Sequence, residues 1–435
     1  METKLNLISK RALKDRKCKF NNLMHLINVE NLTECFHLLK RDKATGIDNV
    51  SMDEYGAKLN ENLTDLIKRM KSFSYRPQAV RRVNIPKPNG KLRPLGIPCV
   101  EDKVVQMGIS RILTAIYETD FLDCSYGFRP NRSCHDALNA LDKVIMTEPI
   151  NYVIDADIKG FFDNVDQKWL LQCLQVRITD QNLLRYIVRI LKSGVMENGA
   201  KVETNKGTPQ GGVISPVLAN IYLHYILDLW FEKVVKRHVH GVVEMVRYAD
   251  DFVICVENES DANRILDALK KRLQKFSLEL AEDKTKIIRL CRKGNDDENH
   301  DKQVKSFNFL GFTHFCDKTR KGHFKLGRTT DKKKFSTKLK EMNIWLKSTR
   351  NILPIKEIWC ILSAKLRGHF QYYGVSGNFR GIKRFNFNTI RLVFKWLNRR
   401  SQKKSFNWQE FQVYLERFPL PKPKIYHNLY TLYRF

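Results

Sequence analysis

Four aspartates in two short stretches have the residue type and spacing to bind a metal ion. Asp250 and Asp251 are adjacent in "VVEMVRYADDFVICVEN", between two apolar, β-branched runs. Asp155 and Asp157 lie on one face of a period-two strand in "YVIDADIKGFF". Adjacent carboxylates repel each other, and burial makes it harder to ionise both. A hard cation such as Mg²⁺ relieves this repulsion, and two such ions stabilise the attacking and leaving oxygens in phosphoryl transfer.

Each aspartate motif also has an ordinary structural explanation. Asp is a common turn residue, so Asp250 and Asp251 could be two solvated side chains at a hairpin tip. Asp155 and Asp157 could cap a strand end or form ion pairs. The two motifs together favour the metal site, because a buried carboxylate without a partner is costly and a cation would satisfy both.

Two further stretches could handle phosphates. "NIPKPNGKLRPLGIP" places Lys87, Lys91 and Arg93 around a tight turn, where they could converge on a triphosphate. "KGTPQGGVISP" surrounds Gln210 with glycines, which permit a close approach of the backbone to a ligand. A solvated basic hairpin and an ordinary loop are the alternatives.

The elements that would position these residues alternate between helix and strand. The first seventy residues read as helical, with Ser51 as an N-cap, and residues 79–98 read as two strands around Pro88-Asn89-Gly90. We expect Asp166 to cap a helix, the aspartate pair to lie in a hairpin, and "SFNFLGFTHF" to form one strand. The remaining expected elements are helices at 101–117, 133–147 and 260–276, a hairpin turning at Asn198-Gly199, a long helix after the Gly/Pro loop and a strand at 286–290.

The charge balance indicates a polyanionic partner. The chain has 435 residues, 77 Lys and Arg against 47 Asp and Glu, and a formal charge of +30. Residues 318–404 hold 24 of the basic residues and three acids, a net +21, interleaved with aromatics. Nucleic acid is the leading candidate partner and an anionic membrane surface is the second. We place a domain boundary near residue 317.

The remaining composition favours an intracellular protein. The ten cysteines include no Cys-x-x-Cys pair, so we expect reduced core residues and no structural zinc. No apolar run reaches eighteen residues, and the basic N-terminus lacks a secretory core. We therefore expect no membrane partner and an intracellular location, in the cytoplasm or associated with the nucleoid.

The motifs, taken together and in order, resemble a known family. "RYADDFVI" is similar to the Tyr-Ala-Asp-Asp box of reverse transcriptases, and the stretches around it resemble the polymerase blocks of the group II intron-encoded reverse transcriptase and maturase family. "LKRDKATGIDNV" resembles the extra N-terminal block of that family, and "AKLRGHFQYYGVSGN" with "WLNRRSQKKSFNWQEF" resembles its thumb. The other matching stretches are "IPKPNGKLRPLGIP", "SYGFRPNRSCHDAL", "DADIKGFFDNV", "GTPQGGVISPVLANIYL", "LELAEDKTKI" and "FNFLGF", so the match runs from about residue 20 to about residue 430.

The resemblance implies an α+β, right-hand polymerase fold with fingers, a palm built on an antiparallel sheet with helices, and a helical thumb. It places an N-terminal extension and extra block in 1–74, fingers and palm in 75–316, and a basic thumb or maturase region in 317–435. Many relatives carry a zinc-dependent endonuclease after the thumb. This chain stops at Phe435, so we expect the short type that lacks it.

The resemblance also assigns roles to residues. Asp157, Asp250 and Asp251 match the three metal-binding aspartates, which leaves Asp155 outside the site, and the backbone carbonyl of Ile158 completes the shell of two Mg²⁺ ions. Lys284 matches a family lysine. Phe162 matches the gate that excludes a ribose 2′-hydroxyl. The nucleotide-binding matches are Lys87, Arg93 and Gln210, and the RNA-binding candidates are Arg399, Arg400, Lys403 and Lys404.

The function implied is RNA-templated DNA synthesis by two-metal phosphoryl transfer. The partners would be an RNA template, a DNA or RNA primer, dNTPs and a structured group II intron RNA whose splicing and mobility the protein assists. A splicing-only RNA-binding maturase is one alternative. An intron-free relative acting in DNA repair or phage defence is the other, and the flanking DNA would separate it from the first reading. The sequence leaves the oligomeric state open.

Overall fold

The computed structural model divides the chain into two compact units. It describes residues 2–86, 92–197, 199–203, 205–209, 211–290, 306–402 and 405–430. The first unit comprises Met1–Ala137, Ala156–Ile254 and Glu259–Lys286. The second comprises Leu138–Asp155, Cys255–Asn258 and Ile287–Phe435.

The N-terminal part of the first unit is helical, as the sequence predicts. It contains α1 (Glu2–Lys14), α2 (Val29–Leu38), α3 (Met52–Ala57), α4 (Leu59–Lys71) and α5 (Val100–Tyr117). Ser51 caps α3 through a capping box, in which its hydroxyl accepts a hydrogen bond from the Glu54 amide and the Glu54 carboxylate accepts one from the Ser51 amide. Most of α5 is buried, so this helix forms the centre of the unit.

A four-stranded sheet of order β2-β1-β4-β5 follows in the first unit. β1 (Val80–Pro86) pairs antiparallel with β2 (Leu92–Ile97), which confirms the two strands predicted around Pro88-Asn89-Gly90, although that turn lies outside the described residues. β4 (Val195–Glu197) runs parallel to β1 and antiparallel to β5 (Ala200–Val202).

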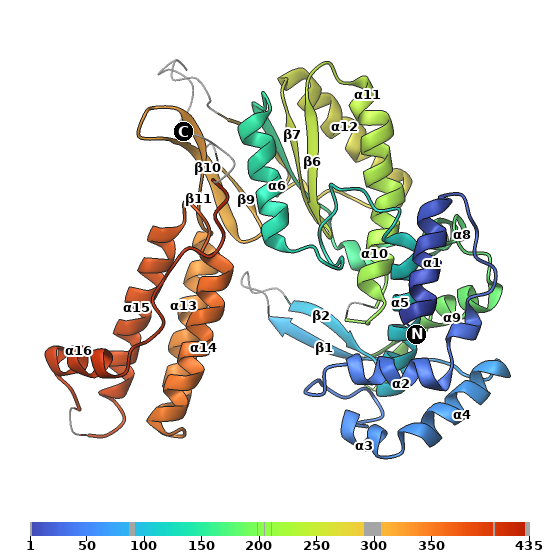
Figure 1. The fold of residues 1–435 in the computed structure, drawn as a ribbon, viewed down its shortest axis with the longest axis horizontal. Helices are drawn as coiled ribbons and strands as arrows, with labels where there is room; N and C mark the ends of the chain where they lie inside the picture. The colour runs from blue at the N-terminus through green and yellow to red at the C-terminus, as the bar shows by residue number, and fades with distance from the viewer. Residues whose placement is uncertain are drawn as a thin grey trace. The chain divides into compact units, whose positions relative to one another are not determined.

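The second four-stranded sheet has the order β6-β7-β3-β8, and Figure 1 shows its strands β6 and β7 side by side. Its strands are β3 (Tyr152–Asp157), β6 (Val243–Tyr248), β7 (Asp251–Val256) and β8 (Lys286–Arg289). β7 and the apolar positions of β3 are buried because they carry Val, Ile, Ala and Phe side chains. Asp166 caps α8 (Gln167–Gln175) as predicted, since its carboxylate accepts from the Lys168 and Trp169 amides. The other helices of this part of the first unit are α7 (Phe161–Asn164), α9 (Gln181–Leu191) and α12 (Glu259–Lys275).

The long helix predicted after the Gly/Pro loop is present, with two π turns in it. It begins with α10 (Ser215–Leu223), passes through η2 (His224–Asp228) and η3 (Phe231–Val235), and ends with α11 (Lys236–His238). A π turn holds one more residue than an α turn, so it rotates the side chains that follow it. The buried Asp228 closes the first of them.

The second unit contains a three-stranded sheet, β11-β10-β9, followed by helices. The prediction of a single strand in "SFNFLGFTHF" is wrong, because β9 (Ser306–Phe309) and β10 (Phe312–Lys318) form a hairpin. Its tip, Leu310-Gly311, has φ of 50° and 79°, as in a type I′ turn. The sequence on both sides of this tip is mostly apolar, so the turn is difficult to recognise from the sequence. The remaining elements are α6 (Cys134–Thr147), most of which belongs to this unit, β11 (Phe324–Thr330), α13 (Lys332–Thr349), α14 (Ile355–Tyr373), α15 (Phe379–Leu397) and α16 (Trp408–Arg417).

No helix in the described part of the chain is both long enough and apolar enough to cross a membrane.

Candidate active site

The aspartate pair lies at the tip of the β6–β7 hairpin. Ala249, between the two strands, has φ of 58°, a left-handed conformation that side chains with a Cβ rarely adopt. Asp250 follows it in the turn and Asp251 begins β7, and both carboxylates are half-buried. The predicted hairpin is therefore confirmed, with Ala249 rather than a glycine in the left-handed position.

Asp157 comes to the same edge of the sheet because β3 and β7 are neighbours. The Asn151 amide donates to the carbonyl of Val256 at 3.1 Å, so the start of β3 lies at the end of β7. The two strands are thus antiparallel, and the end of β3, Asp157, meets the start of β7, Asp251.

The three carboxylates repel one another. Burial raises the pKa of Asp250, and the neighbouring charge of Asp157 raises it further, while its own backbone, Arg93 and Arg247 act in the opposite direction. The net effect is a carboxyl that resists ionisation in the metal-free protein. A cation at this edge would reverse that effect, so the site has the electrostatics that metal binding requires.

The backbone of the next residue, Ile158, is oriented by an antiparallel bridge to Leu280. The Lys159 amide donates to the Glu279 carbonyl and the Ala281 amide donates to the Asp157 carbonyl, both at 2.8 Å. In this pattern Ile158 and Leu280 form a non-hydrogen-bonded pair, so the Ile158 carbonyl points away from the 279–281 segment. That orientation fits the predicted role of this carbonyl as a metal ligand.

Lys284 supplies the cation at Asp157 in this structure, since its ammonium nitrogen forms a short ion pair with the Asp157 carboxylate. This hydrogen bond raises the pKa of Lys284. Among the described residues, no three His, Cys, Asp or Glu side chains are grouped closely enough to hold a metal ion as they stand. Asp157 is turned to Lys284 instead, so a metal ion would compete with the ammonium group for this carboxylate.

Phe162 lies in α7, five residues after Asp157, and is 9% exposed. The amide of Thr208, in the "GTPQGG" loop, donates to the carbonyl of Phe162 at 2.8 Å. In the same loop Gly211 has φ of 111°, and a Cβ on it would lie 2.7 Å from the carbonyl oxygen of Gly96 in β2. The loop therefore packs between α7 and the β1–β2 hairpin, and it needs a glycine at 211 to do so.

The structure describes only part of the predicted nucleotide-binding set. Arg93 is an exposed residue of β2, opposite Ile85 in β1, and its charge acts on Asp250. Lys87 and Gln210 lie outside the described residues, but the residues on either side of Gln210, Pro209 and Gly211, are described.

The predicted RNA-binding residues lie after α15 in the second unit. Arg399 is exposed, with its guanidinium carbon 5.5 Å from the ring centre of Trp396. Arg400 is half-buried and donates to the carbonyl of Leu353 at 3.2 Å. Lys403 and Lys404 lie outside the described residues.

A cavity of about 860 Å³ in the second unit joins basic and aromatic side chains from α13, α15 and α16. The residues that line this cavity were not predicted individually, although the alternation of Lys, Arg and aromatic positions in 318–404 indicated this region. Its lining includes Lys340, Arg391, Lys395, Phe387 and Trp408.

Sequence reasoning missed the buried residues beneath the aspartate hairpin, above all Arg247 in β6. Arg247 is fully buried and paired with Asp228. The signal was an arginine inside the apolar run "VVEMVRYA", where a buried charge needs a partner.

Comparison of the sequence with known proteins identifies a matching family and several relatives. The family model described as reverse transcriptase (RNA-dependent DNA polymerase) matches residues 85–314. The group II intron-encoded protein LtrA of Lactococcus lactis subsp. cremoris is 30% identical over 462 residues, covering 88% of this chain and 75% of that protein.

Other relatives match a smaller share of this chain. Protein YkfC of Escherichia coli (strain K12) is 33% identical over 311 residues, covering 63% of this chain and 81% of that protein. The putative COX1/OXI3 intron 2 protein of Saccharomyces cerevisiae is 29% identical over 275 residues, covering 63% and 30%. Among solved structures, telomerase from Candida albicans in complex with a fragment of telomeric RNA matches with a TM-score of 0.47 and 13% identity, over 86% of this chain and 64% of that one.

Proposed function

The chain belongs to the reverse transcriptase family, among the group II intron-encoded proteins, and is an RNA-directed DNA polymerase; from this premise we propose that it works with two Mg²⁺ ions at the edge of the β6-β7-β3-β8 sheet. Asp157, Asp250, Asp251 and the carbonyl of Ile158 would hold the ions. Reverse transcriptases as a family use divalent metal ions, so the finer part of this proposal is the number of ions, their identity and these ligands.

The observation that carries the proposal is the meeting of Asp157, at the end of β3, with the Asp250-Asp251 tip of the neighbouring β6–β7 hairpin. Burial and the nearby Asp157 also raise the pKa of Asp250. A carboxyl in this state is unfavourable for the fold alone and favourable for a cation-binding site. When bound, the ions neutralise the charge that develops on the reacting phosphate and lower the pKa of the primer 3′-hydroxyl.

The incoming dNTP would lie between the β1–β2 hairpin and α7. Arg93, with Lys87, would bind the triphosphate, and Gln210 would contact the nucleotide from the "GTPQGG" loop. Phe162 would lie beside the sugar. The packing of Thr208 on the Phe162 carbonyl and of Gly211 against Gly96 supports this, because it brings loop, helix and hairpin together.

The RNA template is a partner that follows from the family, and we propose that the primer is DNA or RNA and that a structured group II intron RNA is a further partner. The segment 317–435 would act as thumb and RNA-binding region, with 75–316 as fingers and palm and 1–74 as the N-terminal block. The support is the net charge of +21 in 318–404 and the basic, aromatic cavity lined by Lys340, Arg391 and Lys395. RNA is bound largely through phosphates and stacking, which these residue types provide.

Two other functions are alternatives to the proposed polymerase site. A splicing-only maturase would need the RNA-binding region and no metal site, so the Asp157, Asp250 and Asp251 set favours the polymerase. An intron-free relative in repair or defence would share every feature described. A search of the flanking DNA for the catalytic RNA of an intron separates it from the intron-associated protein.

The test of the metal site uses Asp250→Asn and Asp251→Asn in primer extension on an RNA template. We expect both variants to lose extension while keeping the fold. Because the folded pKa of Asp250 is raised, the metal-free protein gains stability at pH values where Asp250 is protonated and loses it as the pH rises through that pKa. At neutral pH, without metal, Asp250→Asn should therefore melt at or above the wild-type temperature. Extension near the wild-type rate by either variant would show that these carboxylates are not the metal ligands.

A further inference from the structure

Arg247 lies directly beneath the aspartate pair and is completely buried, with 0% of its surface exposed. Its Nε and Nη2 donate to the two oxygens of Asp228 at 2.7 and 2.5 Å, and Nη1 donates to Asn220 Oδ1 at 3.1 Å. Nη2 also donates to Ser125 Oγ at 2.8 Å. Burial acts to lower the pKa of Arg247, but the Asp228 carboxylate outweighs it and the pKa is raised, so the guanidinium stays charged.

The same guanidinium reaches the catalytic turn itself. Nη1 donates to the carbonyl oxygen of Ala249 at 2.9 Å, and Ala249 is the residue with the left-handed backbone immediately before Asp250. A turn of this kind persists only where the surroundings impose it. Arg247 therefore joins the turn to Asp228 and Asn220 on the long helix through one rigid, planar group.

A loop of the first unit, residues 122–132, supports the turn from the other side. The Arg247 amide donates to the Cys124 carbonyl and the Tyr126 amide donates to the Arg247 carbonyl, both at 2.8 Å. The Asn220 side-chain amide donates to the carbonyl of Gly127 at 2.7 Å. Gly127 approaches so closely that a Cβ on it would lie 2.3 Å from the nitrogen of Ala249.

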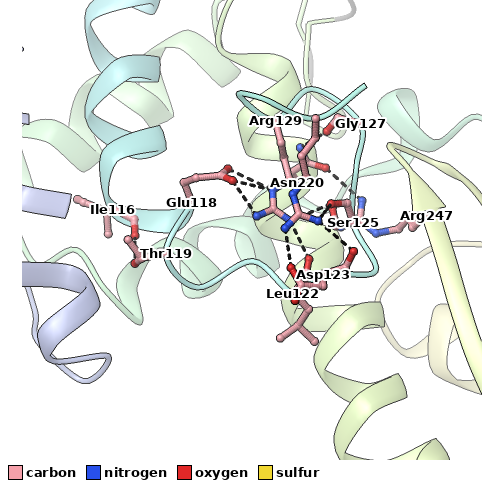
Figure 2. Close-up of polar contacts among 11 residues, drawn as sticks. Ile116, Glu118, Thr119, Leu122, Asp123, Ser125, Gly127, Arg129, Asn220 and Arg247 are labelled. Carbon is pink, nitrogen blue, oxygen red and sulfur yellow. Dashed lines mark hydrogen bonds and ion pairs between the residues drawn. The ribbon is translucent and has the colours of Figure 1, made fainter. Parts of the chain in front are cut away.

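Arg129 holds this loop in shape. Its Nη1 donates to the carbonyls of Leu122 and Ser125 at 2.7 and 2.8 Å, and its Nη2 donates to Glu118 at 2.7 Å. Figure 2 shows this guanidinium between the Glu118 carboxylate and the carbonyls of the loop, with Arg247 on the far side of Ser125. Loop, helix and hairpin thus meet at Arg247.

We propose that Arg247 is a positioning residue for the metal-binding pair, fixing the Ala249 turn so that Asp250 and Asp251 both face Asp157. The inference rests on the proposed metal site and adds to it the group that sets its geometry. The described hydrogen bonds of its side chain go to Asp228, Asn220, Ser125 and Ala249, so it acts on the aspartate pair through the turn. A lysine at 247 would keep the charge and lose the fork that bonds Asp228, Asn220, Ser125 and Ala249 together.

The competing explanation is that Arg247 and Asp228 form a buried ion pair that serves only the stability of the fold. The chain offers a matched control in Arg177, which is 1% exposed and donates to both oxygens of Asp120 at 2.6 and 2.8 Å. Arg177 also donates to the carbonyls of Ala12 and Cys18 and has no described hydrogen bond to the hairpin. Arg177→Lys therefore removes a similar buried fork elsewhere in the same unit.

The experiment compares Arg247→Lys with Arg177→Lys in the full chain. Binding of Mn²⁺ alone is measured by electron paramagnetic resonance without nucleic acid, and extension is measured in single turnover at saturating primer-template and dNTP while Mg²⁺ is varied. We expect both variants to lose thermal stability. Only Arg247→Lys should bind Mn²⁺ about tenfold or more weakly, in the range found when a group behind a metal ligand is changed. It should also need more Mg²⁺ for its maximal extension rate.

A wild-type Mn²⁺ affinity and Mg²⁺ dependence in Arg247→Lys would overturn the proposal, and so would an equal loss in both variants. If Arg247→Lys does not fold, Ser125→Ala removes one hydrogen bond to the fork, and a weakened Mn²⁺ affinity in it supports the proposal while an unchanged affinity overturns it. If the wild type binds Mn²⁺ but extends no primer, the proposed role of the metal site in DNA synthesis fails while the Mn²⁺ comparison still decides the role of Arg247.

Discussion

Lys284 forms an ion pair with Asp157, one of the proposed metal ligands, and its side chain is 60% exposed. An exposed ion pair contributes little to stability, about 0–1 kcal/mol, so this contact is easily exchanged. The pKa of Asp250 is raised by burial and that of Lys284 by its hydrogen bond to Asp157, so two shifted groups lie close together, as they often do at functional sites.

Removing the competing ammonium group should strengthen metal binding. We expect Lys284→Ala to bind Mn²⁺ alone more tightly than wild type, since Asp157 is then available to the ion. Lys159→Ala is the control, because Lys159 is similarly exposed and pairs with Glu279 at 3.4 Å, so the variant makes the same change in charge without freeing Asp157. Mn²⁺ titrations of the three proteins check this. An equal gain in Mn²⁺ affinity in both variants would show that the effect comes from the change in net charge and not from freeing Asp157.

Phe162 offers a prediction about sugar selection. Phe162→Ala should open space beside the incoming sugar and raise the incorporation of rNTPs relative to dNTPs by about tenfold or more, the scale on which one small group is discriminated by a pocket wall. Phe161→Ala is the matched control, since Phe161 is 2% exposed and belongs to the core of the same short helix. The measurement is the ratio of rNTP to dNTP incorporation. An unchanged ratio in Phe162→Ala would make Phe162 a core aromatic.

At the scale of elements, the catalytic hairpin depends on the loop at 122–132 that packs against it. Gly127→Ala places a methyl group against the backbone nitrogen of Ala249, and this backbone cannot move without moving the turn. We expect a loss of about 1–3 kcal/mol in the free energy of unfolding, as for other overpacked sites, together with a large loss of extension. Thermal melting and primer extension measure the two effects.

Gly368→Ala is the control for this substitution, because a Cβ at this position in α14 meets nothing within 4 Å. Alanine is favoured over glycine inside a helix, so this variant should be as stable as wild type or more stable. Full activity in Gly127→Ala would show that the turn tolerates displacement of its support.

The sequence predicted the elements whose signals are local. The N-caps Ser51 and Asp166 and the β6–β7 hairpin depend on neighbouring residues and were confirmed. The hairpin at Leu310-Gly311 was missed, because one glycine in an apolar run does not distinguish a strand from a tight turn. The arginine in "VVEMVRYA" indicates a buried charge that needs a partner, but its partners could not be predicted, since Ser125 and Asn220 lie 122 and 27 residues away in the chain.

At the scale of the whole molecule, the positive charge is unevenly distributed along the chain. Residues 318–404 carry +21 of the formal +30, and this excess lies in the second unit. A high density of like charge opposes folding unless a polyanion offsets it. The proposed metal ligands Asp157, Asp250 and Asp251 all belong to the first unit, so we expect that binding of RNA and chemistry on the nucleotide can be changed separately.

Charge reversal at Arg399 and Arg400 should weaken RNA binding and leave the metal site intact. Each phosphate contact that is lost should flatten the slope of log affinity against log salt by roughly one unit. Extension should recover when primer-template is raised to saturation. The double reversal of Lys271 and Lys275, two exposed residues of α12, makes the same change in charge in the first unit and serves as control.

A salt titration of RNA binding and an extension assay at saturation decide this prediction. If the wild type and the Arg399 and Arg400 variant bind RNA with the same affinity and the same salt slope, this segment is not part of the RNA-binding surface. A failure of extension at saturation would mean that the second unit also shapes the active site.

The π turn at η2 sets the side of the long helix on which Asp228 lies. Asn220 and Asp228 both bond Arg247, but eight residues of regular α-helix would turn their side chains about 80° apart. The wider π turn winds less per residue and brings them back toward one face. If the π turn were lost and all eight residues were kept, regular winding would separate the pair. If one residue within 224–227 were deleted as well, the two side chains would be seven residues apart and about 20° from a common direction. The π turn therefore accommodates the eighth residue and keeps both partners of Arg247 on one side of the long helix.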